Sequence, residues 1–252
     1  MERVNPDPWH KQILTNPRGG RRLAISDVHG FAHTLAELVV HKIKLTPEDQ
    51  LFLLGDYIDR GTGNGLVLDF IMDLQKRGFQ VFPLRGNHEQ MLLDAWNEFT
   101  FEKDNGSDLR FHAMIEAIDL VDESGNLAST YLRFVDSLPY YYELDRFYLV
   151  HAGFNFHGSD PFSDYESMLW MWNFVRNPTG KTVIHGHQTT DLSAIQQNIQ
   201  AKQPIICIDN GCYYGVSLHD IRKYTPHFTI DKGNLCALDL DTYELFVQKN
   251  IG

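Results

Sequence analysis

The chain has 252 residues, with 22 Lys or Arg against 33 Asp or Glu, so its formal net charge is −11. This length allows one large domain or two small ones, and a hydrophobic content of 43% with 12% aromatic residues excludes a disordered chain. The surplus of acid argues against a protein held mainly by nucleic-acid phosphates or anionic lipid.

The N-terminal stretch is expected to be irregular. Residues 1–20 carry three prolines and a Gly-Gly pair, which interrupt helices and strands. Regular patterning follows without a convincing linker, so we predict an irregular N-terminal extension over 1–20 and a single domain over 21–252. A more polar stretch at about 97–138 is predicted to be a helical insertion that shapes the site.

Short apolar strands alternate with helical patterns in the first third of the chain. Strands are predicted at 22–26, 51–54 and 81–84, and apolar residues recur at helical spacing after each of them. This alternation is typical of βαβ units, whose strands are parallel with right-handed crossovers. A turn at Asp241-Thr242 predicts a hairpin later in the chain, so we expect an α/β domain with two sheets. The later strands are predicted at 147–150, 182–184, 205–208, 235–240 and 243–247.

Residues that are costly to bury follow the predicted strands. Asp27, Asp56 and Asn87 come after the first three strands, about 30 residues apart, which is one βαβ unit. His151 and His187 follow two later strands. Because ligands in α/β sheets gather at the carboxyl ends of strands, we expect these side chains at one edge of the fold.

Carboxylate, imidazole and amide groups are ligands for divalent metals such as manganese, iron or zinc. Asp27 and His29 are two residues apart, so both can point at one ion from an extended segment. Asp56 can reach the same ion and can bridge to another through its second oxygen. The second ion can be held by Asn87, His151 and His187.

A two-metal centre activates a water as nucleophile and neutralises the oxygens of a phosphoryl group. Arg60 and Arg85 can offer forked donors to phosphate, with Asn87 beside them. His88 and Asp59 form a candidate acid pair, in which the carboxylate orients the imidazole that protonates the leaving oxygen.

Five sequence blocks carry a resemblance to a known family. The chain resembles the phosphoprotein phosphatase family of calcineurin-like metallophosphoesterases, in its bacterial Ser/Thr protein phosphatase-like branch, over about residues 21–215. The second block alone fixes five of seven positions. The blocks are Asp27-x-His29-Gly30, Gly55-Asp56-x-x-Asp59-Arg60-Gly61, Gly86-Asn87-His88-Glu89, His151-Ala152-Gly153 and Gly186-His187.

The resemblance implies a sandwich of two mixed β-sheets flanked by helices, with two divalent metal ions between the sheet ends. It implies His88 as general acid supported by Asp59, Arg60 at the substrate phosphate with Arg85 nearby, and a metal-bridged hydroxide for in-line attack. Tyr213 or Tyr214 is expected to border the site. The implied metal ligands are Asp27, His29 and Asp56 at one ion, and Asp56, Asn87, His151 and His187 at the other.

One position departs from the family pattern. Many bacterial relatives carry Leu-Trp-x-Arg between the two histidine blocks, and that arginine binds the substrate phosphate. This chain has Trp172 at the corresponding position, after Leu169-Trp170-Met171. Either Arg176 replaces the arginine from one turn later, or the aromatic side chain favours a flat leaving group.

We therefore predict a metal-dependent phosphoric monoester hydrolase that acts on a phosphorylated protein or small phosphoester. Manganese is the expected metal, with iron or zinc as alternatives. The alternative function is a nucleotide hydrolase similar to symmetrical bis(5′-nucleosyl)-tetraphosphatases, although the Asp59-Arg60 form of the second block favours the phosphatase branch. A third alternative, a non-catalytic binding module, disagrees with the complete ligand blocks.

The remaining features predict a cytoplasmic protein. The N-terminus lacks the apolar core of a signal peptide, and no apolar run approaches the roughly 18 residues that span a bilayer. Cys207, Cys212 and Cys236 are too few for a disulfide framework and are expected to be buried thiols. Glu89 is expected to support a turn. We expect neither stable nucleic-acid binding nor membrane binding, and the sequence leaves the oligomeric state open.

Overall fold

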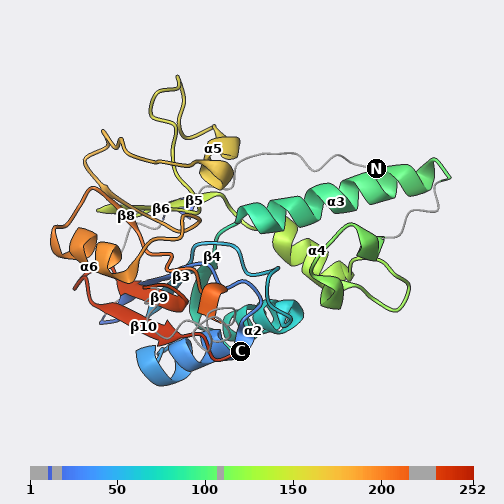
Figure 1. Ribbon diagram of the computed structural model, residues 1–252, viewed down its shortest axis with the longest axis horizontal. Helices are drawn as coiled ribbons and strands as arrows, with labels where there is room; N and C mark the ends of the chain where they lie inside the picture. Colours follow the sequence, from blue (N-terminus) through green and yellow to red (C-terminus); the bar gives the residue numbers. More distant parts are fainter. Residues whose placement is uncertain (1–10, 13–18, 107–110, 216–230) are drawn as a thin grey trace, which may run out of the picture.

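The structure is a computed structural model that describes residues 11–12, 19–106, 111–215 and 231–252 (Figure 1). Its strands form two five-stranded sheets, and each sheet mixes parallel and antiparallel pairs. The predicted α/β sandwich of two mixed sheets with flanking helices is therefore confirmed.

The first sheet has the strand order β10-β9-β2-β3-β4. Strands β2, β3 and β4 are parallel, as the βαβ pattern predicts, and β9 runs antiparallel to both β2 and β10. The predicted hairpin is thus confirmed. Its second strand begins at Leu245 rather than residue 243, because the Asp239 carboxylate accepts bonds from the amides of Asp241 and Thr242 and lengthens the turn. The bounds are β2 Arg22–Ile25, β3 Gln50–Leu53, β4 Gln80–Pro83, β9 Asn234–Asp239 and β10 Leu245–Lys249.

The second sheet has the order β1-β5-β6-β7-β8. Two of its strands are absent from the sequence prediction. Strand β1 (Lys11–Gln12) lies in the stretch predicted to be irregular and pairs with β5 (Tyr141–Glu143). Strands this short take their conformation from the partner strands, which local patterning does not reveal. The other strands are β6 Phe147–Val150, β7 Thr182–His185 and β8 Ile205–Cys207.

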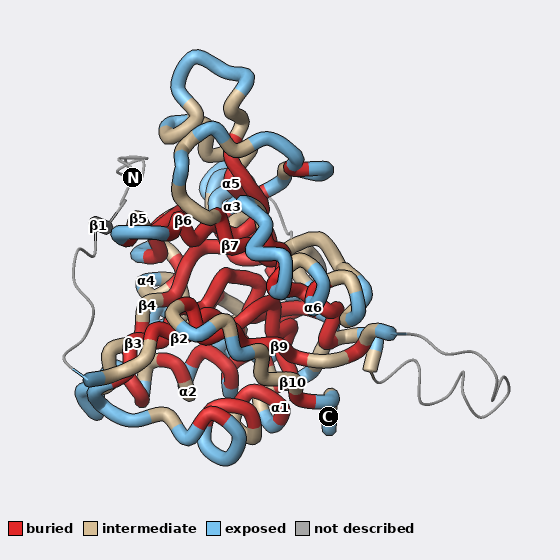
Figure 2. The backbone as a smooth tube through the Cα atoms, turned by 90° about the vertical axis from the view of Figure 1, so that its left-hand side faces the viewer, coloured by how far each residue is buried: buried red, intermediate tan, exposed pale blue. Residues whose placement is uncertain are grey.

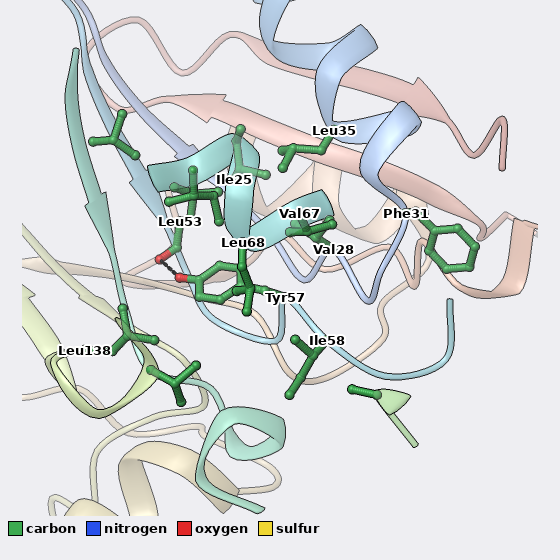
Figure 3. Close-up of a cluster of buried hydrophobic side chains, with 14 of the residues drawn as sticks. Ile25, Val28, Phe31, Leu35, Leu53, Tyr57, Ile58, Val67, Leu68 and Leu138 are labelled. Atoms are coloured by element: carbon green, nitrogen blue, oxygen red, sulfur yellow. Dashed lines mark hydrogen bonds between the residues drawn. The ribbon is translucent and has the colours of Figure 1, made fainter. Parts of the chain in front are cut away.

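Alternate residues along the strands separate the core into layers. Ala24 and Phe52 face the second sheet and pack with Leu149 and Ile184 between the sheets. Their neighbours point the other way, toward helices, as Figure 3 shows for Ile25 and Leu53. The period-2 pattern of the buried strands therefore places helices on the outer face of the first sheet and the second sheet on its inner face.

Helices cover the outer faces of both sheets. Figures 1 and 2 show α1 (Ala32–Ala36) and α2 (Asn64–Lys76) against the first sheet and α5 (Tyr165–Trp170) beyond the second. Helix α1 continues as a π-helical segment, η1 (Glu37–Ile43), so the helical spacing read from the sequence spans two helix types. Helix α6 (Leu192–Gln200) packs beside β8.

The stretch at 97–138, predicted as a helical insertion, begins inside a helix. Helix α3 (Asn87–Asp104) starts directly after β4 and extends away from the sheets (Figure 1). The rest of the stretch, as far as it is described, holds two 3-10 turns and α4 (Ser129–Asp136). Asp119 in this stretch accepts hydrogen bonds from the Asn64 side chain and the Gly65 amide, so it fixes the start of α2 next to the second block.

Among the described residues, no helix is both long and apolar enough to cross a membrane. The three cysteines are free and buried, as predicted.

Phe52 should be a principal stabilising side chain, because it is fully buried between the sheets and lies 5.1 Å and 5.6 Å from the ring centroids of Phe82 and Tyr142. We expect Phe52→Ala to lower the free energy of unfolding by about 3–5 kcal/mol. The matched control is Phe101→Ala, since Phe101 is 66% exposed and its loss should cost about 0.5 kcal/mol or less. Urea denaturation measures both, and equal effects would contradict this packing.

Candidate metal centre

The strand-end residues of both sheets meet around one cavity of about 400 Å³. Asp27, Asp56 and Asn87 follow β2, β3 and β4, whereas His151 and His187 follow β6 and β7 of the other sheet. The centre therefore lies where the carboxyl ends of two sheets come together. Seven of the predicted site residues line this cavity: Asp27, His29, Asp56, Arg60, Asn87, His88 and His187.

One group of potential ligands contains His29, Asp56 and His88, with ligand atoms within 4.8 Å of one another. The Oδ2 atom of Asp56 lies 3.7 Å from His29 Nε2 and 3.9 Å from His88 Nε2. The other ring nitrogen of His29, Nδ1, lies 3.0 Å from the Ile58 carbonyl oxygen. A proton held there on Nδ1 leaves Nε2 available as a metal donor.

A second group contains Asp56, His151 and His187, again within 4.8 Å. It uses the other oxygen of Asp56, since Oδ1 lies 3.5 Å from His151 Nε2. Asn87 Oδ1 lies 2.8 Å from His151 Nε2 and 2.9 Å from His187 Nδ1, so it joins this group. His187 Nε2 is buried without a hydrogen-bond partner in the described part of the chain. Asp56 thus presents one oxygen to each group, which is the arrangement of a bridging ligand.

Asp27 lies outside both groups of three but lines the same cavity. Its carboxylate accepts the backbone N–H of His187 at 2.9 Å and 3.2 Å, and so it connects the two sheets. The approach requires glycine at position 186, because a Cβ there would lie 2.0 Å from Asp27 Oδ1. Asp27 as a metal ligand stays a prediction.

Burial shifts the pKa values of the carboxylates and imidazoles at the centre in directions that favour the binding of cations. Burial, together with the charges of Asp209 and Asp56, holds the pKa of Asp27 well above its ordinary value. Burial raises the pKa of Asp56 and of Asp209 to about 6. Burial also lowers the pKa of His29 and of His151 to about 3, which leaves these imidazoles neutral. Clustered buried carboxylates beside neutral imidazoles are a donor set that fits two divalent ions.

Glu89 holds the loop that carries Asp56. Its fully buried carboxylate accepts three backbone N–H groups, from Asp56 and Tyr57 at 2.8 Å and from Gly86 at 2.9 Å. These amides belong to the loops after β3 and β4, so one side chain joins two strand ends. Glu89 therefore supports a turn, as the sequence predicts.

The His88 imidazole pairs with Asp59 as predicted from the sequence. His88 Nδ1 lies 2.6 Å from Asp59 Oδ2, which orients the ring so that Nε2 faces Asp56. Burial disfavours the charged imidazole, but the Asp59 hydrogen bond and the charges of Asp56 and Asp59 outweigh it and raise the pKa of His88 above its ordinary value. The same ring belongs to the first ligand group, so its position suits either proton transfer or metal binding.

Several loop residues of the centre adopt the left-handed backbone region that L-residues rarely occupy. Their φ values range from 52° to 71°. Such conformations cost about 1–3 kcal/mol each and persist where surrounding contacts impose them. The residues are His29, Asp56, Asp59, Arg60 and His187.

The predicted phosphate-binding arginines occupy different places. Arg60 lines the cavity, and its guanidinium lies 5.5 Å from the Tyr213 ring centroid. Arg85 is not among the cavity-lining residues, contrary to the sequence expectation. Its buried guanidinium donates to the Asp136 carbonyl at 2.7 Å and to Gln90 at 2.9 Å, because α3 and the end of α4 enclose it.

Arg176 does not take the place of the missing arginine. Its guanidinium contacts His157 Nδ1 at 3.3 Å, and it does not line the cavity. Trp172 does line it, with its ring centroid 5.0 Å from that of His187. Of the two sequence alternatives, the structure places the aromatic side chain at the centre.

The sequence reasoning missed some cavity-lining residues. Asp209 is buried, accepts the Gly211 amide at 2.7 Å and lies within reach of the Thr189 hydroxyl at 3.4 Å. It follows strand β8 directly, so the strand-end rule applied to the other clusters would have found it. The further lining residues are Trp170, Thr189 and Lys232, besides the expected Tyr213 and Tyr214.

Comparison with known proteins finds one family profile and two curated relatives that match this chain. The profile of the calcineurin-like phosphoesterase family matches residues 20–231. Shewanella-like protein phosphatase 1 of Plasmodium berghei (strain Anka) is 26% identical over 154 residues, 54% of this chain and 40% of that protein. The symmetrical bis(5′-nucleosyl)-tetraphosphatase of Shigella dysenteriae serotype 1 (strain Sd197) is 35% identical over 96 residues, 38% of this chain and 32% of that protein. The matches thus span less than half of either relative.

Solved structures share the fold at low sequence identity. A candidate diadenosine tetraphosphatase has a TM-score of 0.58 and 17% identity, covering 97% of this chain and all of that one. A protein serine/threonine phosphatase from Saccharomyces cerevisiae has a TM-score of 0.55 and 14% identity, covering 97% of this chain and 85% of that one.

The family profile covers most of the chain, and the two His/Asp groups supply donors for a dinuclear metal site. The match to the family profile is thus accompanied by side chains that are placed as metal ligands. The chain belongs to the calcineurin-like phosphoesterase family, and its two His/Asp groups could hold a dinuclear metal site.

Proposed function

We propose that the protein hydrolyses phosphoric monoesters in the manner of phosphoprotein phosphatases, acting on a phosphorylated protein or a small phosphoester. The observation that carries this proposal is the 2.6 Å contact between His88 Nδ1 and Asp59 Oδ2, set beside an Asp56 that faces two ligand groups. A hydrolase needs a proton donor next to its metal centre, and this pair supplies one.

Each side chain at the cavity has a separate role in the proposed reaction. Two divalent ions, when bound, supply a nucleophile from water and neutralise phosphoryl oxygens. Arg60 presents its guanidinium to the substrate phosphate from the cavity wall. His88 gives its proton to the leaving oxygen while Asp59 holds the ring and favours its charged form. The proposed ligands are those predicted from the sequence, with manganese as the first metal to test and the cytoplasm as the proposed location.

A second candidate function is hydrolysis of a dinucleoside polyphosphate. The specific observation is that two cations, Arg60 and Lys232, line one cavity, and two cations can meet successive phosphates. The similarity to a symmetrical bis(5′-nucleosyl)-tetraphosphatase supports the same candidate. We rank it second because the Asp59-Arg60 form of the second block favours the phosphatase branch.

Replacing His88 should separate proton transfer from metal binding. We expect His88→Ala to lower kcat toward a phosphoserine peptide by about 10²–10⁴-fold, because the leaving alkoxide then lacks its proton donor. His41→Ala is the control, since His41 is exposed on η1. Metal content is measured by mass spectrometry in parallel. Undiminished kcat, or loss of metal together with activity, would rule out the acid role.

Removing metal should abolish activity and reduce stability. Buried Asp27, Asp56 and Asp209 lose their compensating charge, so dialysis against EDTA should stop hydrolysis and lower the Tm. Addition of Mn²⁺ at about 100 times its Kd should restore roughly 2.7 kcal/mol of stability per site. Calorimetric titration should count two ions per chain, and full activity of metal-free protein would refute a metal-dependent mechanism.

The two candidate substrates can be compared in one assay. We expect a higher kcat/KM for a phosphopeptide than for diadenosine tetraphosphate. Lys232→Ala should change phosphopeptide hydrolysis little, because a monoester presents one phosphate to the cavity. Lys76→Ala on the exposed face of α2 is the control for lost charge. A preference for the dinucleotide that disappears in Lys232→Ala would reverse our ranking.

A further inference from the structure

Aromatic side chains lie beside both ligand groups of the metal centre. The Tyr213 ring centroid lies 5.3 Å from that of His29 and 4.2 Å from that of Tyr214. The Trp172 ring centroid lies 5.0 Å from that of His187. Because His29 and His187 belong to different ligand groups, the tyrosine pair and Trp172 contact different groups of the centre, and all three rings line its cavity.

Trp172 is exposed although it lies at a polar site. Trp172 is 65% exposed, so most of its indole surface is free to contact a ligand. Large aromatic side chains left in water beside a cavity commonly serve as anchors for ligands. Trp172 therefore offers a flat apolar surface next to the group that would hold the second ion.

The charge distribution supports the same use. Among the described residues, the cavity-lining cations are Arg60, which lies beside Tyr213, and Lys232, which contacts the Thr189 carbonyl. The position beside His187 carries Trp172, and Arg176 is turned toward His157. The described part of the chain thus places an aromatic ring at this position, where it can contact the leaving group of a bound substrate.

The tyrosine pair is held in place by backbone geometry. Gly211 has φ of 68°, and a Cβ at that position would lie 2.6 Å from Tyr214 Cδ2. The missing side chain lets Tyr214 pack onto the loop that follows Asp209. The position of Tyr214 in the cavity wall is therefore set by this loop.

We propose that Trp172, with Tyr213 and Tyr214 in the same cavity, selects phosphomonoesters whose leaving group is an aromatic ring borne on the bridging oxygen, as in phosphotyrosine. The inference rests on the proposed function. Trp172 touches a residue of the metal centre itself, so a ring stacked on it is close to the phosphorus. A nucleobase is separated from its phosphate by a ribose and would reach beyond this position.

The reaction is hydrolysis of the aryl ester. A water oxygen bonds to phosphorus, the bond from phosphorus to the phenolic oxygen breaks, and that oxygen keeps the electron pair and takes a proton. Inorganic phosphate and the free phenol are the products. Tyrosine has a side-chain pKa of about 10, so its oxygen leaves more readily than the alkoxide of serine.

The test compares phosphotyrosine and phosphoserine peptides with identical flanking residues. We expect the Trp172 contact to raise kcat/KM for phosphotyrosine about fivefold relative to phosphoserine, since an aromatic pair contributes about one kcal/mol beyond buried area. Trp172→Ala should reduce the preference by about this factor by raising KM for phosphotyrosine, whereas Trp172→Phe should keep part of the contribution. Phe101→Ala, which removes an equally exposed aromatic residue from α3, should change neither substrate.

The outcomes separate this inference from the proposed function. Equal kcat/KM for the two peptides, or an equal loss for both in Trp172→Ala, would overturn the role of Trp172 and leave the phosphatase function standing. A wild-type protein inert toward both peptides and toward a small phosphoester such as p-nitrophenyl phosphate would overturn the proposed function itself. A Trp172→Ala defect confined to diadenosine tetraphosphate would show that the ring contacts a nucleobase and would refute the aryl ester. Thermal denaturation checks that the exposed replacement leaves the fold intact.

Discussion

The centre depends on carboxylates that the fold buries together. Asp27, Asp56 and Asp209 lie at adjoining strand ends, and burial raises the pKa of each. The imidazoles of His29 and His151 beside them are kept neutral, so they bring no compensating charge. Such a cluster is costly unless cations enter it. The demand for positive charge therefore links folding, metal binding and phosphate recognition, since the cations that relieve the cluster also attract the substrate.

The acidic net charge of the chain fits this account. The formal charge of −11 belongs to the chain as a whole, whereas two divalent ions, when bound, would make the cavity locally positive. Glu89 contributes to the same arrangement without facing substrate, because its carboxylate fixes the amides of Asp56, Tyr57 and Gly86. Glu89 thus supports the loops, whereas Asp56 faces both ligand groups.

The parts of the site that sequence predicts are those set by local chain geometry. Asp27, Asp56 and Asn87 follow parallel strands, so strand periodicity alone predicts that they meet. The direction of a long side chain depends on distant packing, and for this reason Arg85 was expected at the phosphate although α3 and α4 enclose its guanidinium. The short strands β1 and β5 escaped prediction because they depend on partners far along the chain. The proposed substrate specificity is harder to predict from sequence, because it depends on cavity-lining residues such as Trp172 that lie outside the shared sequence blocks.

The left-handed backbone at the centre has a consequence for how this protein can change. Five loop residues there hold conformations that glycine or asparagine would adopt more easily. Replacing these residues with glycine or asparagine would relieve backbone strain and raise the free energy of unfolding. It would also remove the side chains that take part in the proposed reaction. Stability and activity are therefore in a trade-off at these positions. A duplicated gene whose product need not be catalytic could gain stability through substitutions at these loop positions. Stabilising substitutions that keep the activity should instead be sought on the helix surfaces.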